Sequence, residues 1–397
     1  MGPAVVITFC FGFLQLGTAL GSSVEGRLHF PELGATRGHT VEEYDVITED
    51  GYILRLFRIR GARKRPILLM HGLLDSSDTW TVRGNASLAA TLAAEGHDVW
   101  LGNCRGNRYA RRHIYLDPEA GDGFWDYSFH EHGFYDLSAI IDSVLSLTGA
   151  DRLDAVGHSQ GATIFYVLGS TRPEYNRRVN LLVALGPVCY LQNVGPPLKT
   201  LIRHSTLIYE MATSLQWQEV FGESGWPATL KSLCLTPLIG YTMCVSSALF
   251  LITGRDEDEL ETGIVPALIE RFPMATSAKN LYHFAQVGHR RAFARFDHGP
   301  EGNLESYGDQ TPPAYDLDSV TMRVALFAGG NDGLSTLEDV AILRNRLPNV
   351  VQHTIMPHRM MNHADFVWGR HMDEYLFPYI LDVLQTYGEQ EYPDNFE

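Results

Sequence analysis

The segment Gly157-His-Ser-Gln-Gly161 is a G-x-S-x-G pattern centred on Ser159. Apolar residues at 152–156 predict a short strand before the pattern, and those at 161–169 predict a helix after it. A sharp strand-to-helix turn lifts the serine hydroxyl clear of a sheet, where a base can take its proton and a substrate can reach it. The two glycines lack a Cβ atom, which allows strand and helix to approach closely. We therefore expect Ser159 to be a nucleophile rather than an ordinary turn serine.

A serine activated in this way needs a histidine base and an acid that orients the histidine. On a sheet of this kind both follow the serine in the chain, at the carboxyl ends of later strands. Asp332 comes after a predicted strand at 322–328 through a Gly-Gly-Asn turn, which can present its carboxylate at that edge. Asp316 and Asp318 precede the strand, and Asp339 falls in the first turn of the next helix, where it can stabilise the helix dipole. Asp332 is the predicted acid.

The chain has 16 histidines, so position rather than residue type has to identify the base. His363 lies in the loop between the last predicted strand and the last predicted helix, from which it can reach back to the serine. His353 lies inside that strand and His371 opens that helix. His358 lies slightly earlier in the same loop as His363 and is the main alternative. Position alone leaves both open, and His363 is the expected base once the family resemblance described below is included.

Acyl transfer places negative charge on the carbonyl oxygen of the substrate, and two backbone N–H groups aimed at that oxygen would stabilise it. Gln160 follows the nucleophile at the start of a helix, so its N–H and the helix dipole both favour the anion. Leu73 follows His71-Gly72 in the loop after a predicted strand, which is the second place where such a donor is found. The alternative is that His71-Gly72 only ends the strand. We expect Leu73 and Gln160 to form the oxyanion hole.

The 397-residue chain is 45% hydrophobic, which is enough for a packed core, and has a formal net charge of -16. An acidic chain is repelled by nucleic acid, so no nucleic-acid partner is expected.

The first 24 residues carry no charge, and the apolar run 4–16 ends near a small-x-small sequence at 19–21. A signal peptide over 1–21 is predicted, with an uncleaved N-terminal anchor as the alternative. No later apolar run approaches the roughly 18 to 20 residues that a membrane span requires. Asn85-Ala-Ser87 is a glycosylation sequon, which suits a surface loop of a secreted protein.

Removal of a signal peptide would leave four cysteines in an oxidising compartment, where they allow three full pairings. Cys234 and Cys244 flank a short turn-like segment, which favours a disulfide between them, and Cys104 and Cys189 are expected to be free and buried. No C-x-x-C pair or spaced Cys/His set predicts a metal site, and no cofactor is expected.

Strand and helix signals alternate along most of the chain. An Asp-Gly turn at 50–51 joins two strand-like runs in a predicted hairpin, and strands at 66–70 and 97–101 flank a helix at 86–95. The alternation continues with a helix at 133–147 and strands at 181–185 and 350–355, and the last helix is expected at 371–387. These elements predict an α/β fold with a mostly parallel sheet covered by helices on both faces.

The alternation stops at Gly195-Pro-Pro197, and about a hundred residues of helical or irregular sequence follow before it resumes. We expect a core formed by 22–186 and 301–397, with 187–300 inserted as a mainly helical cap or lid.

With these residues assembled, the chain resembles the acid lipase family, which includes gastric and lysosomal acid lipases and their insect relatives. The resemblance extends from about residue 43 to residue 387. The matching motifs are Glu43-Tyr44, Thr48-Glu-Asp-Gly-Tyr-Ile-Leu54, His71-Gly-Leu-Leu74, Asp98-Val-Trp-Leu-Gly-Asn103, Arg105-Gly-Asn107, Gly157-His-Ser-Gln-Gly161, Gln310-Thr-Pro-Pro313, Asp332 and Asn362-His-Ala-Asp-Phe366. The resemblance implies an α/β-hydrolase core with a lid. It also implies the triad Ser159, Asp332 and His363, the oxyanion donors Leu73 and Gln160, and the disulfide Cys234–Cys244.

The expected function is therefore that of a monomeric serine lipase, acting on triacylglycerol or cholesteryl ester at a lipid–water interface. We expect it to be secreted, with the lysosome as the alternative destination. Two other functions remain open: an esterase or thioesterase for small soluble substrates, and a non-catalytic lipid carrier on the same scaffold.

Overall fold

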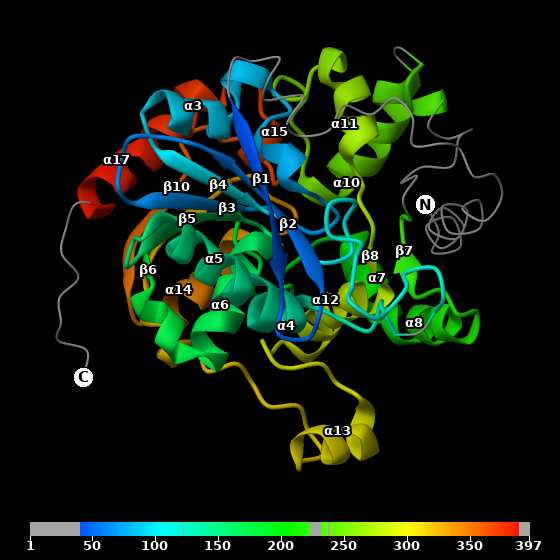
Figure 1. Cartoon of the computed structure of the whole chain (residues 1–397). Helices are drawn as coiled ribbons and strands as arrows, with labels where there is room; N and C mark the ends of the chain where they lie inside the picture. Colours follow the sequence, from blue (N-terminus) through cyan, green and yellow to red (C-terminus); the bar gives the residue numbers. More distant parts are fainter. Residues whose placement is uncertain (1–39, 122, 223–231, 237–238, 389–397) are drawn as a thin grey trace.

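The computed structural model describes residues 40–121, 123–222, 232–236 and 239–388 (Figure 1). The predicted signal peptide, 1–21, lies outside these residues. The central feature is an eight-stranded sheet with the strand order β1-β2-β4-β3-β5-β6-β9-β10. Its first two strands, β1 (Val41–Ile47) and β2 (Ile53–Ile59), form the predicted antiparallel hairpin.

The remaining strands of this sheet run parallel to one another, so their carboxyl ends lie at one edge. They are β3 (Pro66–Met70), β4 (Asp98–Gly102), β5 (Leu153–His158), β6 (Val179–Leu185), β9 (Arg323–Ala328) and β10 (Val350–Ile355). Every residue of β3, β4, β5, β6 and β9 is buried, which explains their continuous apolar sequences. The predicted parallel α/β sheet is confirmed.

Helices cover both faces of the sheet (Figure 1). One face packs on α5 (Ser138–Thr148), α6 (Gln160–Thr171) and α14 (Leu337–Arg346), and the other packs on α3 (Leu88–Ala94) and α17 (Phe377–Gly388). The predicted helix at 133–147 begins as a π-helical turn over His132–Leu137 before α5. The last predicted helix is divided into α16 (Met372–Tyr375) and α17.

The described part of the chain between β6 and β9 is mainly helical. It contains α7 (Leu198–Arg203), α8 (Ser205–Ser214), a π-helical segment Tyr241–Leu249, α10 (Phe250–Thr253), α11 (Val265–Arg271), α12 (Ala278–Arg290) and α13 (Gly299–Tyr307). Two short strands, β7 (Glu219–Val220) and β8 (Thr276–Ser277), pair within it. A disulfide joins Cys234 to Cys244, whereas Cys104 and Cys189 are free and buried. We call residues 187–300 the insertion.

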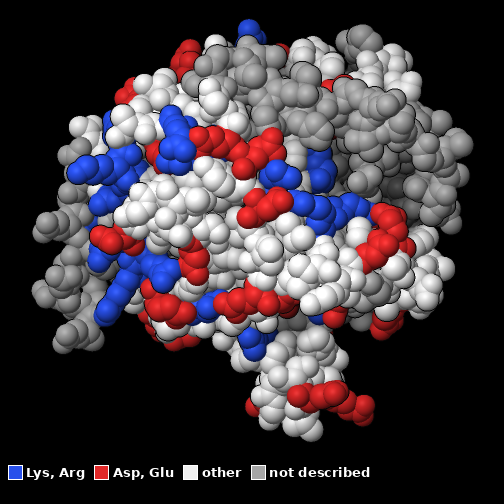
Figure 2. All heavy atoms as spheres, viewed as in Figure 1, with Lys and Arg blue, Asp and Glu red and all other residues white. Residues whose placement is uncertain are grey.

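On the face shown in Figure 2, acidic and basic side chains alternate over the hairpin and its surroundings. Arg55 pairs with Glu43, and Arg112 pairs with Asp45, so these cations are neutralised by neighbouring carboxylates. Among the helices that the structure describes, none combines the length and the apolar character of a membrane span.

Candidate active site

Ser159 occupies the turn between β5 and α6 in a backbone conformation that side chains rarely adopt, with φ 55° and ψ -121°. Its N–H donates to the carbonyl oxygen of Leu185, 3.0 Å away. A Cβ atom on Gly157 would lie 2.6 Å from the oxygen of Gly161, and one on Gly161 would lie 2.1 Å from the oxygen of Met70. Both glycines are therefore required by the close approach of α6 to the strands, as the sequence predicts.

His363 and Asp332 form a buried pair at the same edge of the sheet. The Nδ1 atom of His363 lies 2.8 Å from Oδ2 of Asp332 and donates its proton to this carboxylate. The other carboxylate oxygen, Oδ1, accepts the backbone N–H groups of Leu334 and Ser335 at 2.8 and 2.7 Å. The Nε2 atom of His363 is buried and has no hydrogen-bond partner among the described residues. Its lone pair is thus free to take a proton.

Two glycines allow the loops of this region to approach closely, one beside the His363–Asp332 pair and one beside the serine. Gly186 follows β6 with φ 51°, and a Cβ atom there would lie 3.1 Å from Oδ2 of Asp332 and 3.2 Å from Nδ1 of His363. A Cβ atom on Gly72 would lie 3.3 Å from the Cβ atom of Ser159. The loops after β3, β5, β6, β9 and β10 therefore converge, and they bring together the serine, the acid, the histidine and the predicted oxyanion loop.

The oxyanion loop is held by His71. The Nε2 atom of this ring accepts from the N–H of Cys104 and from Nδ2 of Asn107, both at 3.2 Å, so the proton is on Nδ1. Nδ1 donates to the carbonyl oxygen of Gly72 at 2.8 Å, and burial lowers the pKa of His71 to about 4, which keeps the ring neutral. A trans peptide bond points its N–H away from its carbonyl oxygen, so this bond also fixes the direction of the Leu73 N–H.

Gln160 is held through its side chain. Its Nε2 lies 3.2 Å from Nδ1 of His132, and its Oε1 accepts from Nδ2 of Asn280, 2.8 Å away on α12. Neither the Leu73 N–H nor the Gln160 N–H has a hydrogen-bond partner among the described residues. Both groups are available to a developing oxyanion.

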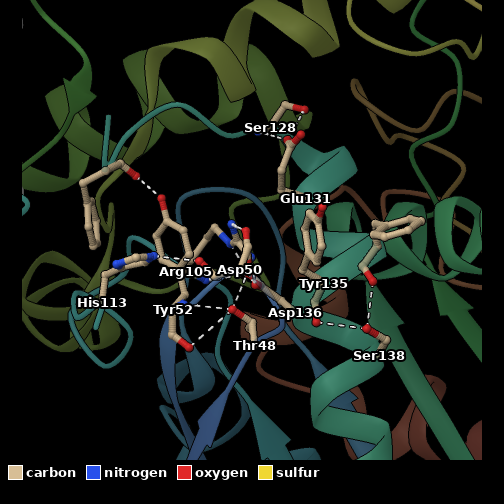
Figure 3. A network of polar contacts seen from close by, with 12 residues as sticks. Thr48, Asp50, Tyr52, Arg105, His113, Ser128, Glu131, Tyr135, Asp136 and Ser138 are labelled. Atoms are coloured by element: carbon tan, nitrogen blue, oxygen red, sulfur yellow. Dashed lines mark hydrogen bonds and ion pairs between the residues drawn. The ribbon is translucent and has the colours of Figure 1, made fainter. Parts of the chain in front are cut away.

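Arg105 holds together three segments beneath the oxyanion loop. The sequence alone did not indicate a role for it. Figure 3 shows its guanidinium between two carboxylates from distant parts of the chain: Nη1 and Nη2 bind Asp50 at 2.6 and 2.9 Å, and Nε binds Asp136 at 2.8 Å. The guanidinium also lies 3.8 Å from the ring centre of Tyr52. The arginine thereby joins the hairpin turn, the Cys104–Asn107 loop and the segment before α5. Its pairing with the Asp-Gly turn was not evident from the sequence.

The other histidines and aspartates considered as base or acid have different partners. His358 pairs with Asp256 and His371 pairs with Glu259, whereas His353 is within β10. Asp316 caps a short 3-10 turn, and Asp339 accepts from the backbone and side chain of Asn193. No group of three or more potential metal ligands occurs in the described ranges.

Known proteins match this chain over most of its length. Residues 30–84 match the partial alpha/beta-hydrolase lipase region, and residues 65–217 match the alpha/beta hydrolase fold. Lipase 1 of Drosophila melanogaster is 37% identical over 91% of this chain and 80% of its own length. Gastric triacylglycerol lipase of Homo sapiens is 34% identical over 94% of both chains.

Solved structures agree in fold. A bacterial membrane phospholipase A superposes with a TM-score of 0.52 at 12% identity, covering 98% of this chain and 97% of its own. VinJ superposes with a TM-score of 0.50 at 14% identity, covering 87% of this chain and 99% of its own. At these identities the likeness concerns the fold alone. The sequence relatives are identical to this chain at more than a third of the aligned positions, and the alignments cover more than nine tenths of it. The chain therefore belongs to the acid lipase family of α/β hydrolases.

Proposed function

We propose that this protein is a serine lipase that hydrolyses neutral lipid esters through an acyl-enzyme. The observation that carries the proposal is the state of His363: Nδ1 is committed to Asp332, while Nε2 is buried, unpartnered and at the edge of the sheet that presents Ser159. The relatives named gastric triacylglycerol lipase support a triacylglycerol substrate.

In the proposed reaction His363 Nε2 takes the proton from Ser159 Oγ as this oxygen bonds to the ester carbonyl carbon. The carbonyl oxygen becomes an oxyanion, which accepts from the N–H groups of Leu73 and Gln160. The tetrahedral species collapses, the ester C–O bond breaks, and the imidazolium gives its proton to the departing alcohol. Water then repeats the sequence on the acyl-enzyme: His363 takes a proton from the water, and Ser159 leaves with that proton as the fatty acid is released. The carboxylate of Asp332 stabilises the imidazolium in both steps.

A cavity of about 270 Å³ lies beside the acid and is the proposed place for part of the acyl chain. Its apolar walls come from two parts of the insertion, Pro196 and Leu198 on one side and Phe250, Leu251 and Ile252 on the other. The rest of the lining, which includes Asn331 and Asp332, is polar. An acyl segment that packs against the five apolar side chains would gain free energy in proportion to the apolar area that it buries.

The insertion also offers a surface for a lipid–water interface. Leu207, Met211 and Leu215 are spaced four residues apart along α8 and just past its end, and their side chains are 58%, 39% and 52% exposed. Residues at this spacing share one helix face. We expect a Leu207→Ser and Met211→Ser variant to lose activity on an emulsion while hydrolysing a soluble ester normally, whereas equal loss on both substrates would contradict the interfacial role.

The catalytic assignment is tested with Ser159→Ala, His363→Ala and the unaltered enzyme on triolein, cholesteryl oleate and a short p-nitrophenyl ester. Loss of about a millionfold in kcat is expected for either variant if the residues act as one unit. A wild-type enzyme that turns over only the soluble ester would favour the esterase alternative. Substantial residual activity in Ser159→Ala would contradict the triad.

We further propose that the protein is exported, to the extracellular space or the lysosome, after removal of residues 1–21, and that 187–300 is its cap. The disulfide Cys234–Cys244 and the exposed Asn85 side chain support export. N-terminal sequencing of the protein from the culture medium, with glycosidase treatment of wild type and Asn85→Gln, tests the cleavage and the glycan together.

A further inference from the structure

His158, the residue before the nucleophile, takes no part in the triad but contacts its base. It is the last residue of β5, and its Nε2 lies 3.0 Å from the carbonyl oxygen of His363. A carbonyl oxygen can only accept, so Nε2 of His158 carries the proton and donates it. The strand that ends at the nucleophile therefore also holds the backbone of the base.

The two imidazole rings pack against one another. Their centres are 4.8 Å apart and their planes are inclined by 39°. His158 is buried, and burial, followed by the proximity of His363, holds the pKa of His158 well below its usual range. The ring is thus neutral, and its unprotonated Nδ1 faces Gly72 of the oxyanion loop, where a Cβ atom would lie 3.1 Å away.

We propose that His158 is a positioning residue for the catalytic base, acting through the hydrogen bond from its Nε2 to the carbonyl oxygen of His363. The proposal rests on the proposed function, because it assigns a role within that triad. His158 is the last residue of β5 and Ser159 follows it directly in the turn, so any displacement of the end of β5 moves the nucleophile and the support of its base together. A misplacement of about 1 Å in such a site costs about a hundredfold in rate, which is why a direct tie of this kind matters.

The other hydrogen bonds of His363 lead to other parts of the chain. Its N–H donates to the carbonyl oxygen of Thr253, and its Nδ1 donates to Asp332. Among the hydrogen bonds that His363 makes with other described residues, only the one from His158 comes from β5, the strand that precedes the nucleophile. Its neutrality is equally important, because a second cation against the ring would oppose formation of the imidazolium on His363.

The test compares His158→Gln with His158→Asn. The amide nitrogen of glutamine reaches about as far from Cα as Nε2 of histidine, whereas that of asparagine reaches only as far as Nδ1. Glutamine can therefore restore the donor and asparagine cannot. His158→Phe keeps a ring without any donor, and His289→Phe on the exposed part of α12 is the control.

With a short p-nitrophenyl ester we expect kcat to fall about 10- to 100-fold in His158→Asn and His158→Phe, with KM within about twofold of wild type. His158→Gln should retain kcat within about fivefold, and His289→Phe should equal wild type. The strongly deshielded proton between His363 and Asp332 in the NMR spectrum should shift in the Asn and Phe variants and remain in place in the Gln variant. A role confined to packing would not distinguish Gln from Asn in this way.

Equal kcat in all three His158 variants, or a change confined to KM, would overturn the proposal. If His158→Phe does not fold, the Gln and Asn variants decide the matter on their own. Failure of the proposed function is seen separately, as activity that survives in Ser159→Ala. An inactive Ser159→Ala beside a fully active His158→Asn would remove only the role of His158.

Discussion

The N–H of His363 donates a hydrogen bond of 3.0 Å to the carbonyl oxygen of Thr253, the last residue of α10 in the insertion. The same oxygen accepts the N–H of Gly333, which follows Asp332, at 3.1 Å. One peptide carbonyl from the insertion thus holds the two loops that carry the acid and the base. At this point the insertion supports the loops that carry the proposed acid and base.

Gly254 allows this arrangement, so its replacement should disturb the triad. Its φ is 101°, and a Cβ atom would lie 1.9 Å from the carbonyl oxygen of Asn331. Gly254→Ala is expected to move Thr253 and to reduce kcat by at least about tenfold, measured on a soluble ester.

Gly263→Ala is the matched control for that variant. A Cβ atom there would find its nearest neighbour, Cγ of Glu261, at 3.9 Å, and its φ is outside the left-handed region. This variant should keep its activity and melting temperature. Similar behaviour of the two variants would contradict the bracing role.

The sheet and the edge at which the three proposed catalytic residues lie could be predicted because they depend on local patterns. Ser159, Asp332 and His363 each come after a strand, and parallel strands bring their carboxyl ends to one edge. Position along the chain then favours Asp332 among the acids, whereas the choice of His363 over His358 also needed the family resemblance. The glycines of the nucleophile turn have the same local origin, since their neighbours lie on the adjoining strand and helix.

The contacts that hold the loops of the site in place could not be predicted from the sequence, because they join residues that no periodicity relates. Asp256 meets His358 across 102 positions, and Asp50 meets Arg105 across 55. The insertion segment that holds Thr253 continues into an acidic loop without strand or helix periodicity, which on its own suggests only a solvated turn. Which of its groups face the core depends on the assembled fold.

Asn280 should influence catalysis although it is distant in sequence from the triad. Its Nδ2 donates to Oε1 of Gln160, whose backbone N–H is a proposed oxyanion donor. Asn280→Leu keeps the branched shape of the side chain but removes this donor, so the Gln160 side chain loses one of its two anchors. We expect kcat to fall about tenfold with little change in KM, because oxyanion contacts form in the transition state. His289→Ala, in the exposed part of the same helix, should have no effect, and an increase in KM alone would argue against the assignment.

Arg105 should be among the most important residues for stability. Its side chain is 1% exposed, and Arg105→Met would leave the carboxylates of Asp50 and Asp136 without their partner. Removing one member of a buried ionic network costs about 3 to 5 kcal/mol in the free energy of unfolding. Arg178, which pairs with Asp142 and is 44% exposed, supplies the control. Arg178→Met should cost less than about 1 kcal/mol in urea titrations, and comparable losses in the two variants would refute the distinction.

Buried neutral histidines should make the folded protein sensitive to acid, and His283 offers the clearest case. Burial lowers its pKa from 6.5 to about 3, while Nδ1 and Nε2 are engaged by Ser128 Oγ and the carbonyl oxygen of Ala294, each at 2.9 Å. As the pH falls below about 6.5 the unfolded chain binds a proton that the folded chain does not, so the free energy of unfolding decreases until the pH approaches about 3. One such proton contributes up to about 1.4 kcal/mol per pH unit. His283→Gln should be less stable at pH 7 yet show a shallower decline between pH 6 and pH 4 in urea titrations, by as much as that amount. His289→Gln should leave the slope unchanged, and an undiminished slope in His283→Gln would exclude His283 as a source of acid sensitivity.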